Sequence, residues 1–142
     1  MSELLLFVPV LLFNVCIQVA VVVGIVRYLV KLVRDGRLGS GMVRQSYTLF
    51  SVTLALLVGH LVQIGIWAWL FVAVDEFDDF QDAFYHSAVN FAALGYGDIV
   101  MSEGTRLLGA LEAANGVLMF GLSAATLYAV LIKLIVMEQT ES

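Results

Sequence analysis

Three long apolar segments constrain the fold of this chain more than any other feature. They run from residue 4 to 26, from 46 to 74 and from 107 to 137. About 20 consecutive apolar residues are enough for a helix to cross the hydrocarbon core of a bilayer. Backbone groups in lipid must be satisfied within a helix or a closed barrel. The segments therefore predict an all-α membrane protein with three transmembrane helices per subunit.

Composition excludes several other classes of protein. Of the 142 residues, 61% are hydrophobic and 13% are charged, whereas soluble domains are about 45–50% apolar and about 25% charged. The formal net charge of -5 argues against a nucleic-acid partner. The one cysteine, Cys16, cannot form an intrachain disulfide. Since no nucleophile–base pair is evident, we expect no enzyme activity and no small-molecule substrate.

Basic residues gather around the connection between the first two spans. They are Arg27, Lys31, Arg34, Arg37 and Arg44. Loops rich in lysine and arginine stay on the cytoplasmic side of a membrane. We therefore expect residues 1–34 to form a first transmembrane helix with its N-terminus outside, and residues 35–45 to form a cytoplasmic basic loop. The C-terminus is then cytoplasmic, in a multi-pass protein of the cell membrane (plasma or inner) and in contact with membrane lipid.

The segment between the second and third spans has the opposite charge and an apolar centre. Its acids are Asp75, Glu76, Asp78, Asp79 and Asp82. The centre, residues 83–94, is too short to span and suits a re-entrant helix. Gly95 and Gly97 follow it and permit backbone angles that other residues resist. Non-helical backbone at membrane depth survives only inside protein or beside water, which suggests a pore.

Residues 94–99 read Leu-Gly-Tyr-Gly-Asp-Ile, and here the chain resembles the potassium-channel pore family, of the prokaryotic type with two transmembrane helices and a pore loop. The resemblance covers roughly residues 46–137. It implies a homotetramer around a fourfold axis, with residues 46–142 as the pore domain. That domain would comprise an outer helix at 46–74, a pore helix at 82–93, a selectivity filter at 93–98 and an inner helix at 104–137.

The resemblance also implies roles for single residues. Backbone carbonyls of a filter replace the water shell of a permeating cation, so no cofactor is expected beyond permeating K+ or Na+ ions. The implied ion-binding residues are Ala93, Leu94, Gly95, Tyr96 and Gly97. The filter would be supported by Asp98, His86 and Val89, and the inner helix would bend at Gly116 and Gly121.

Three departures from the family bear on this interpretation. Ala93 stands where the family usually has threonine, which removes a hydroxyl from the innermost ion site. Three functions follow: a potassium-preferring channel, a weakly selective sodium and potassium channel, or a non-conducting module with a channel-like fold. Val89 replaces a glutamate that would bond Asp98. His86 aligns with an aromatic residue, and a hydrogen bond to Tyr96 would make conduction pH-sensitive; simple packing is the alternative.

Polar residues within the spans are the remaining candidates. Glu112 is an intramembrane acid, a costly feature that is usually functional. It could face the pore helix behind the filter, line the cavity, or only bond a neighbouring helix. Two pairs share helix faces, Asn14 with Gln18 and His60 with Gln63, and predict contact between the first two helices. The outer-mouth acids form either a cation-attracting ring or a solvated loop.

Overall fold

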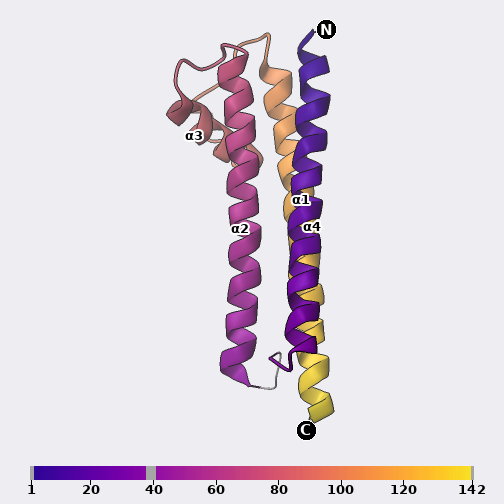
Figure 1. Cartoon of the computed structure of the whole chain (residues 1–142). Coiled ribbons are helices and arrows are strands. Elements are labelled where there is room, and N and C mark those ends of the chain that lie inside the picture. Colours follow the sequence, from indigo (N-terminus) through magenta and orange to yellow (C-terminus); the bar gives the residue numbers. More distant parts are fainter. Residues whose placement is uncertain (1, 38–40, 142) are drawn as a thin grey trace.

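Four α-helices make up the part of the chain that the structure describes. The computed structural model describes residues 2–37 and 41–141. The helices are α1 (Ser2–Arg34), α2 (Met42–Ala73), α3 (Phe80–Phe91) and α4 (Arg106–Glu141). The long helices α1, α2 and α4 run side by side, and the short α3 lies beside α2 near the end where α1 begins (Figure 1). The described residues contain no strand, so the predicted all-helical class is confirmed.

Three of these helices are long and apolar enough to cross a membrane: Phe7–Arg34, Met42–Ala73 and Arg106–Gln139. Two of them extend beyond the predicted ranges, since α2 begins at residue 42 rather than 46 and α4 continues to residue 141 rather than 137. A helix is propagated by backbone hydrogen bonds, so it continues through polar residues outside the apolar run. Of the predicted basic loop at 35–45, residues 38–40 lie outside the described part of the chain.

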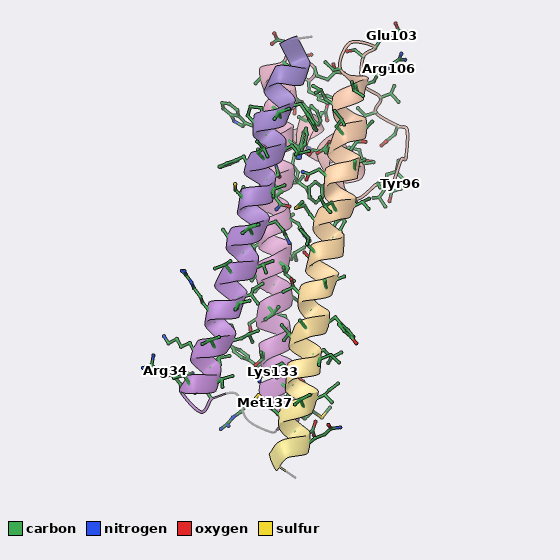
Figure 2. All side chains as sticks on the ribbon, turned by 90° about the vertical axis from the view of Figure 1, so that its right-hand side faces the viewer. Arg34, Tyr96, Glu103, Arg106, Lys133 and Met137 are labelled. Atoms are coloured by element: carbon green, nitrogen blue, oxygen red, sulfur yellow. The ribbon has the colours of Figure 1, made fainter. Side chains whose placement is uncertain are left out.

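The helices pack around α2 and α4. Both α1 and α3 contact these two helices, and α1 lies on the side of α4 away from Tyr96 (Figure 2). One apolar cluster lies around α3 and includes Trp67, Phe71 and Phe91, whose side chains are fully buried. A second cluster around Val52 and Val130 lies toward the other end of the long helices. The loop that follows α3 is thus held on one face of the bundle.

Between the two clusters, polar side chains join α1 to α2. Gln63 Nε2 donates to Gln18 Oε1 at 3.1 Å and to the backbone carbonyl oxygen of Asn14 at 3.2 Å. All three side chains are at most 1% exposed. Polar side chains in apolar surroundings hold helices together because unpaired groups there are costly. The predicted contact between the first two helices is confirmed.

Candidate functional site

The start and the end of the short helix α3 are determined by the residues that flank it. Asp79 caps its start, since the Asp79 carboxylate accepts hydrogen bonds from the backbone nitrogens of Gln81 at 2.6 Å and Asp82 at 3.0 Å. This cap places the start of α3 two residues before the predicted position 82. The helix ends at Phe91 rather than 93 because Ala93 has a left-handed backbone with φ 53°.

The loop of residues 93–98 has an alternating backbone. Ala93, Gly95 and Gly97 have φ angles of 53°, 64° and 72°, in the left-handed region. Glycine adopts these angles without a steric penalty, whereas Ala93 bears a cost of roughly 1–2 kcal/mol. The six residues are all exposed in the single chain. The predicted ion-binding residues therefore share one exposed loop of unusual backbone.

Asp98 closes this loop onto α3. The Tyr85 hydroxyl donates a hydrogen bond of 2.6 Å to Asp98 Oδ2, and this bond lowers the pKa of the Asp98 carboxyl below its ordinary value. Sequence reasoning considered only Val89 as the partner position and missed Tyr85. Tyr85 lies one helical turn before Val89, on the same face of α3. The spacing of four residues from Val89 would have identified Tyr85 as a second candidate partner of Asp98.

His86 is buried behind the loop but does not bond Tyr96. The His86 ring nitrogen Nε2 lies 2.8 Å from Asn90 Nδ2, while Tyr96 is 66% exposed. Within the single chain α3 directs the histidine toward its own next turn, and its ring packs beside that of Phe77, which matches the alternative of simple packing rather than a bond to Tyr96. Burial lowers the pKa of His86, and a hydrogen bond to the Ile99 backbone and the nearby carboxylates only partly oppose this effect.

Glu112 lies where three helices meet. Ser87 Oγ of α3 lies within hydrogen-bond distance of the Glu112 carboxyl group of α4 and of the backbone oxygen of Ile64 in α2, the latter at 2.9 Å, and its one proton is shared between these two partners. Glu112 and Ser87 are both fully buried. Among the predicted alternatives, this geometry matches an acid that faces α3 behind the loop.

Glu76 bonds within the chain. It accepts hydrogen bonds from the Ser102 backbone nitrogen at 2.7 Å, the Ser102 hydroxyl at 2.8 Å and the Thr105 hydroxyl. Burial raises the pKa of Glu76, but the hydrogen bonds from Thr105 and Ser102 outweigh it, so the pKa lies below its ordinary value. Glu76 thus ties the end of α2 to the start of α4.

The other predicted outer-mouth acids are exposed. Asp75, Asp78, Asp79 and Asp82 reach solvent in the single chain. Asp79 has the capping role described above, and Asp82 lies in the first turn of α3, where an acid is favoured by the helix dipole. Of the five predicted outer-mouth acids, Glu76, Asp79 and Asp82 therefore stabilise the local structure. Asp75 and Asp78 contribute charge to the exposed surface.

Acidification should weaken the tie made by Glu76. Because the pKa of folded Glu76 is lowered, its stabilising effect is present above the ordinary pKa of glutamate, about 4.3. The effect is lost as pH falls through the lower folded value. Thermal unfolding of wild type and Glu76→Gln should therefore differ most near neutral pH and converge in acid. A difference that stays constant from pH 7 to strongly acidic pH would contradict this.

The two glycines predicted to bend α4 have different surroundings. The helix continues without a break through both. A β-carbon on Gly116 would lie 2.7 Å from the carbonyl carbon of Phe91, whereas one on Gly121 would meet nothing within 4 Å. Gly116 therefore allows α3 and α4 to approach closely, a reason for glycine that is separate from bending.

Comparison with models of known protein families gives a match. A family model described as an ion channel matches residues 55–133, which is more than half of the chain. The matched stretch runs from within α2, through α3 and the 93–98 loop, and into α4. Helix α1 lies outside it. No curated protein and no solved structure gives a significant match.

Proposed function

Because the chain belongs to the ion channel family, we propose that four copies assemble into a potassium-preferring cation channel. In this proposal α2 is the outer helix, α3 the pore helix and α4 the inner helix. The 93–98 loop is the selectivity filter, and the four loops surround the fourfold axis. Conduction is passive, so the chain needs no catalytic residue and no energy source.

The observation that carries the proposal is the alternating backbone of the 93–98 loop. Left-handed angles at Ala93, Gly95 and Gly97 allow a short stretch of chain to present its carbonyl oxygens as ligands. Residues 93–97 contain no charged side chain, so the backbone must supply the ligands. Carbonyl oxygens that replace the hydration shell are the means by which potassium filters select ions.

The exposure of this loop supports an oligomer. All six residues of the loop are exposed in the single chain and lie outside any helix. Backbone groups without helical partners are tolerated at membrane depth only against protein or a water-filled cavity. A single chain would expose them to lipid. Four chains around an axis would instead enclose the loops and give their oxygens ions and water to bind.

Charge distribution supports an orientation. Arg34 and Lys133 lie at one end of the bundle, and Glu103 and Arg106 at the other (Figure 2). The basic end includes six of the seven Lys and Arg residues of the chain, namely Lys133 and the five named above around the first connection. Under the positive-inside rule this end is cytoplasmic. The filter then opens to the outside of the cell membrane, with the N-terminus outside and the C-terminus inside.

Ala93 favours a second candidate function, a weakly selective sodium and potassium channel. Alanine has no hydroxyl to offer the innermost ion site, and four chains lose four such oxygens together. The left-handed φ of 53° at Ala93 also affects the substitution Ala93→Thr, because a β-branched threonine is strained at such an angle. Selectivity at this site therefore depends on the backbone carbonyl alone.

The reversal potential of the purified protein in planar bilayers separates these functions. Under opposed potassium and sodium gradients, we expect it to lie close to the potassium equilibrium potential. A value near zero would favour the weakly selective channel, and the absence of current would favour a non-conducting module. Gly95→Ala should abolish the current because it strains the filter. Gly24→Ala, whose new β-carbon meets nothing within 4 Å, is the matched control.

Two substitutions at residue 93 test the missing hydroxyl. Ala93→Thr restores the ligand but adds strain, whereas Ala93→Gly removes the strain without adding a ligand. If the hydroxyl limits selectivity, only Ala93→Thr should shift the reversal potential further toward potassium. Equal shifts in both variants would mean that the backbone strain is responsible.

A further inference from the structure

A buried chain of hydrogen bonds runs from α1 through α4 to α2. Gln18 Nε2 donates to the Ser123 hydroxyl at 2.9 Å, and Ser123 Oγ lies 3.0 Å from His60 Nε2. The three side chains are 1%, 5% and 7% exposed. They come from three different helices. Since buried polar groups are costly when unpaired, the three are strongly constrained to remain together.

Gln63 of α2 determines which atoms donate in this series of hydrogen bonds. Gln63 donates to Gln18 Oε1 at 3.1 Å, so the oxygen of the Gln18 amide is already occupied. The amide nitrogen of Gln18 must then face Ser123. Ser123 accepts that proton, and its own hydroxyl proton is free to point at His60. The orientation of the His60 ring thus depends on a residue of α1.

His60 in turn packs against the end of α3. Its ring centroid lies 4.7 Å from that of Phe120 and 6.0 Å from that of Phe91, and the two phenylalanine rings lie 5.6 Å apart. Phe91 is fully buried and is the last residue of α3. The chain enters the 93–98 loop two residues later, at Ala93.

We propose that Gln18 and Ser123 are positioning residues for the filter. They hold the His60 ring against Phe91 and so fix the point at which α3 ends and the loop begins. This inference rests on the channel function proposed above. It concerns α1, which lies outside the stretch matched by the ion channel family. The additional helix is thereby coupled to ion selection and is more than a membrane anchor.

Amide hydrogen exchange tests the coupling without requiring conduction. The amides of Ala92, Ala93 and Leu94 are bonded to carbonyls of α3 at 3.1, 2.8 and 2.9 Å, so they report on the end of that helix. With the whole protein in lipid nanodiscs, Ser123→Ala and Gln18→Leu should each speed their exchange about tenfold, the order expected for one buried hydrogen bond. Ser123→Thr, which keeps the hydroxyl, should restore slow exchange.

Controls separate positioning from general damage. Val19→Ala changes an exposed neighbour on α1 and should leave exchange at residues 92–94 unchanged. The double variant Gln18→Leu/Ser123→Ala should match the single variants, because both break the same chain of bonds. Unchanged exchange at residues 92–94, or an equal rise along all four helices, would overturn the proposal.

The reversal potential provides the second measurement. In a conducting wild type, Ser123→Ala should move the reversal potential toward that of an unselective pore, and Ser123→Thr should not. A wild type that conducts, with Ser123→Ala unchanged in both exchange and reversal potential, would refute the positioning role and leave the channel function intact. A silent wild type would refute the channel function, and the exchange measurement would still decide whether α1 positions the end of α3.

Discussion

Gly116→Ala is expected to destabilise the protein sharply. The added β-carbon would lie 2.7 Å from the carbonyl carbon of Phe91 and 2.9 Å from its Cα atom. These are backbone atoms at the end of α3, which cannot rotate away as a side chain could. Overpacking of this kind costs about 1–3 kcal/mol, occasionally more. Thermal unfolding of the detergent-solubilised protein should show a clear loss of stability.

Two other helical glycines provide matched controls. A β-carbon on Gly24 or Gly121 would meet nothing within 4 Å in the single chain. Replacing a helical glycine by alanine in open space stabilises by roughly 0.5–1 kcal/mol. Gly24→Ala and Gly121→Ala should therefore be neutral or stabilising. Equal destabilisation by Gly116→Ala and Gly121→Ala would contradict the packing explanation.

The same variants test the predicted hinge. A residue that lets α4 bend should alter the opening of the channel when it is stiffened, even if stability is unchanged. Single-channel recordings of Gly121→Ala therefore separate bending from packing. A changed open probability with normal stability would support a hinge at Gly121. An unaltered open probability would remove that residue from gating.

Glu112→Ala is expected to have the second large effect. The substitution removes one of the two hydrogen-bond partners of the Ser87 hydroxyl and empties a fully buried position between α3 and α4. Truncation of a large buried side chain costs about 2–5 kcal/mol. Because Ser87 also bonds the Ile64 backbone, α3 should remain attached to α2 while its contact with α4 loosens. We expect lower thermal stability and faster amide exchange at the end of α3.

The conservative variant Glu112→Gln separates the packing role of this side chain from any role of its carboxyl group in conduction. Glu112→Gln keeps an acceptor oxygen of the same shape and should retain most of the stability, within about 1 kcal/mol. Glu103→Ala removes an exposed acid and serves as a control. If Glu112→Gln folds normally but loses current, the carboxyl group is needed for conduction in addition to its role in packing. If Glu112→Ala is as stable as wild type, Glu112 does not hold α3 to α4.

Much of the candidate site could be predicted from the chain alone because its residues are consecutive. Gly95 and Gly97 mark the unusual backbone, and the apolar stretch before them marks a short helix. The predicted start of α3 is two residues late because Asp79 caps the helix, and the predicted end is two residues late because Ala93 leaves the helical conformation. The partners of Asp98 and His86 were also missed. Their bonds to Tyr85 and Asn90 depend on which face of α3 turns toward the loop.

Segment length and polarity sufficed for the class of fold and the number of spanning helices. The physical reason is that lipid offers no hydrogen bonds, so a long apolar segment has few alternatives to a helix. The pairing of buried polar groups did not follow in the same way. Glu112 meets Ser87, and Ser123 meets His60, across 25 and 63 residues of sequence. Such contacts depend on the rotation and offset of whole helices, which emerge only when their surfaces pack together.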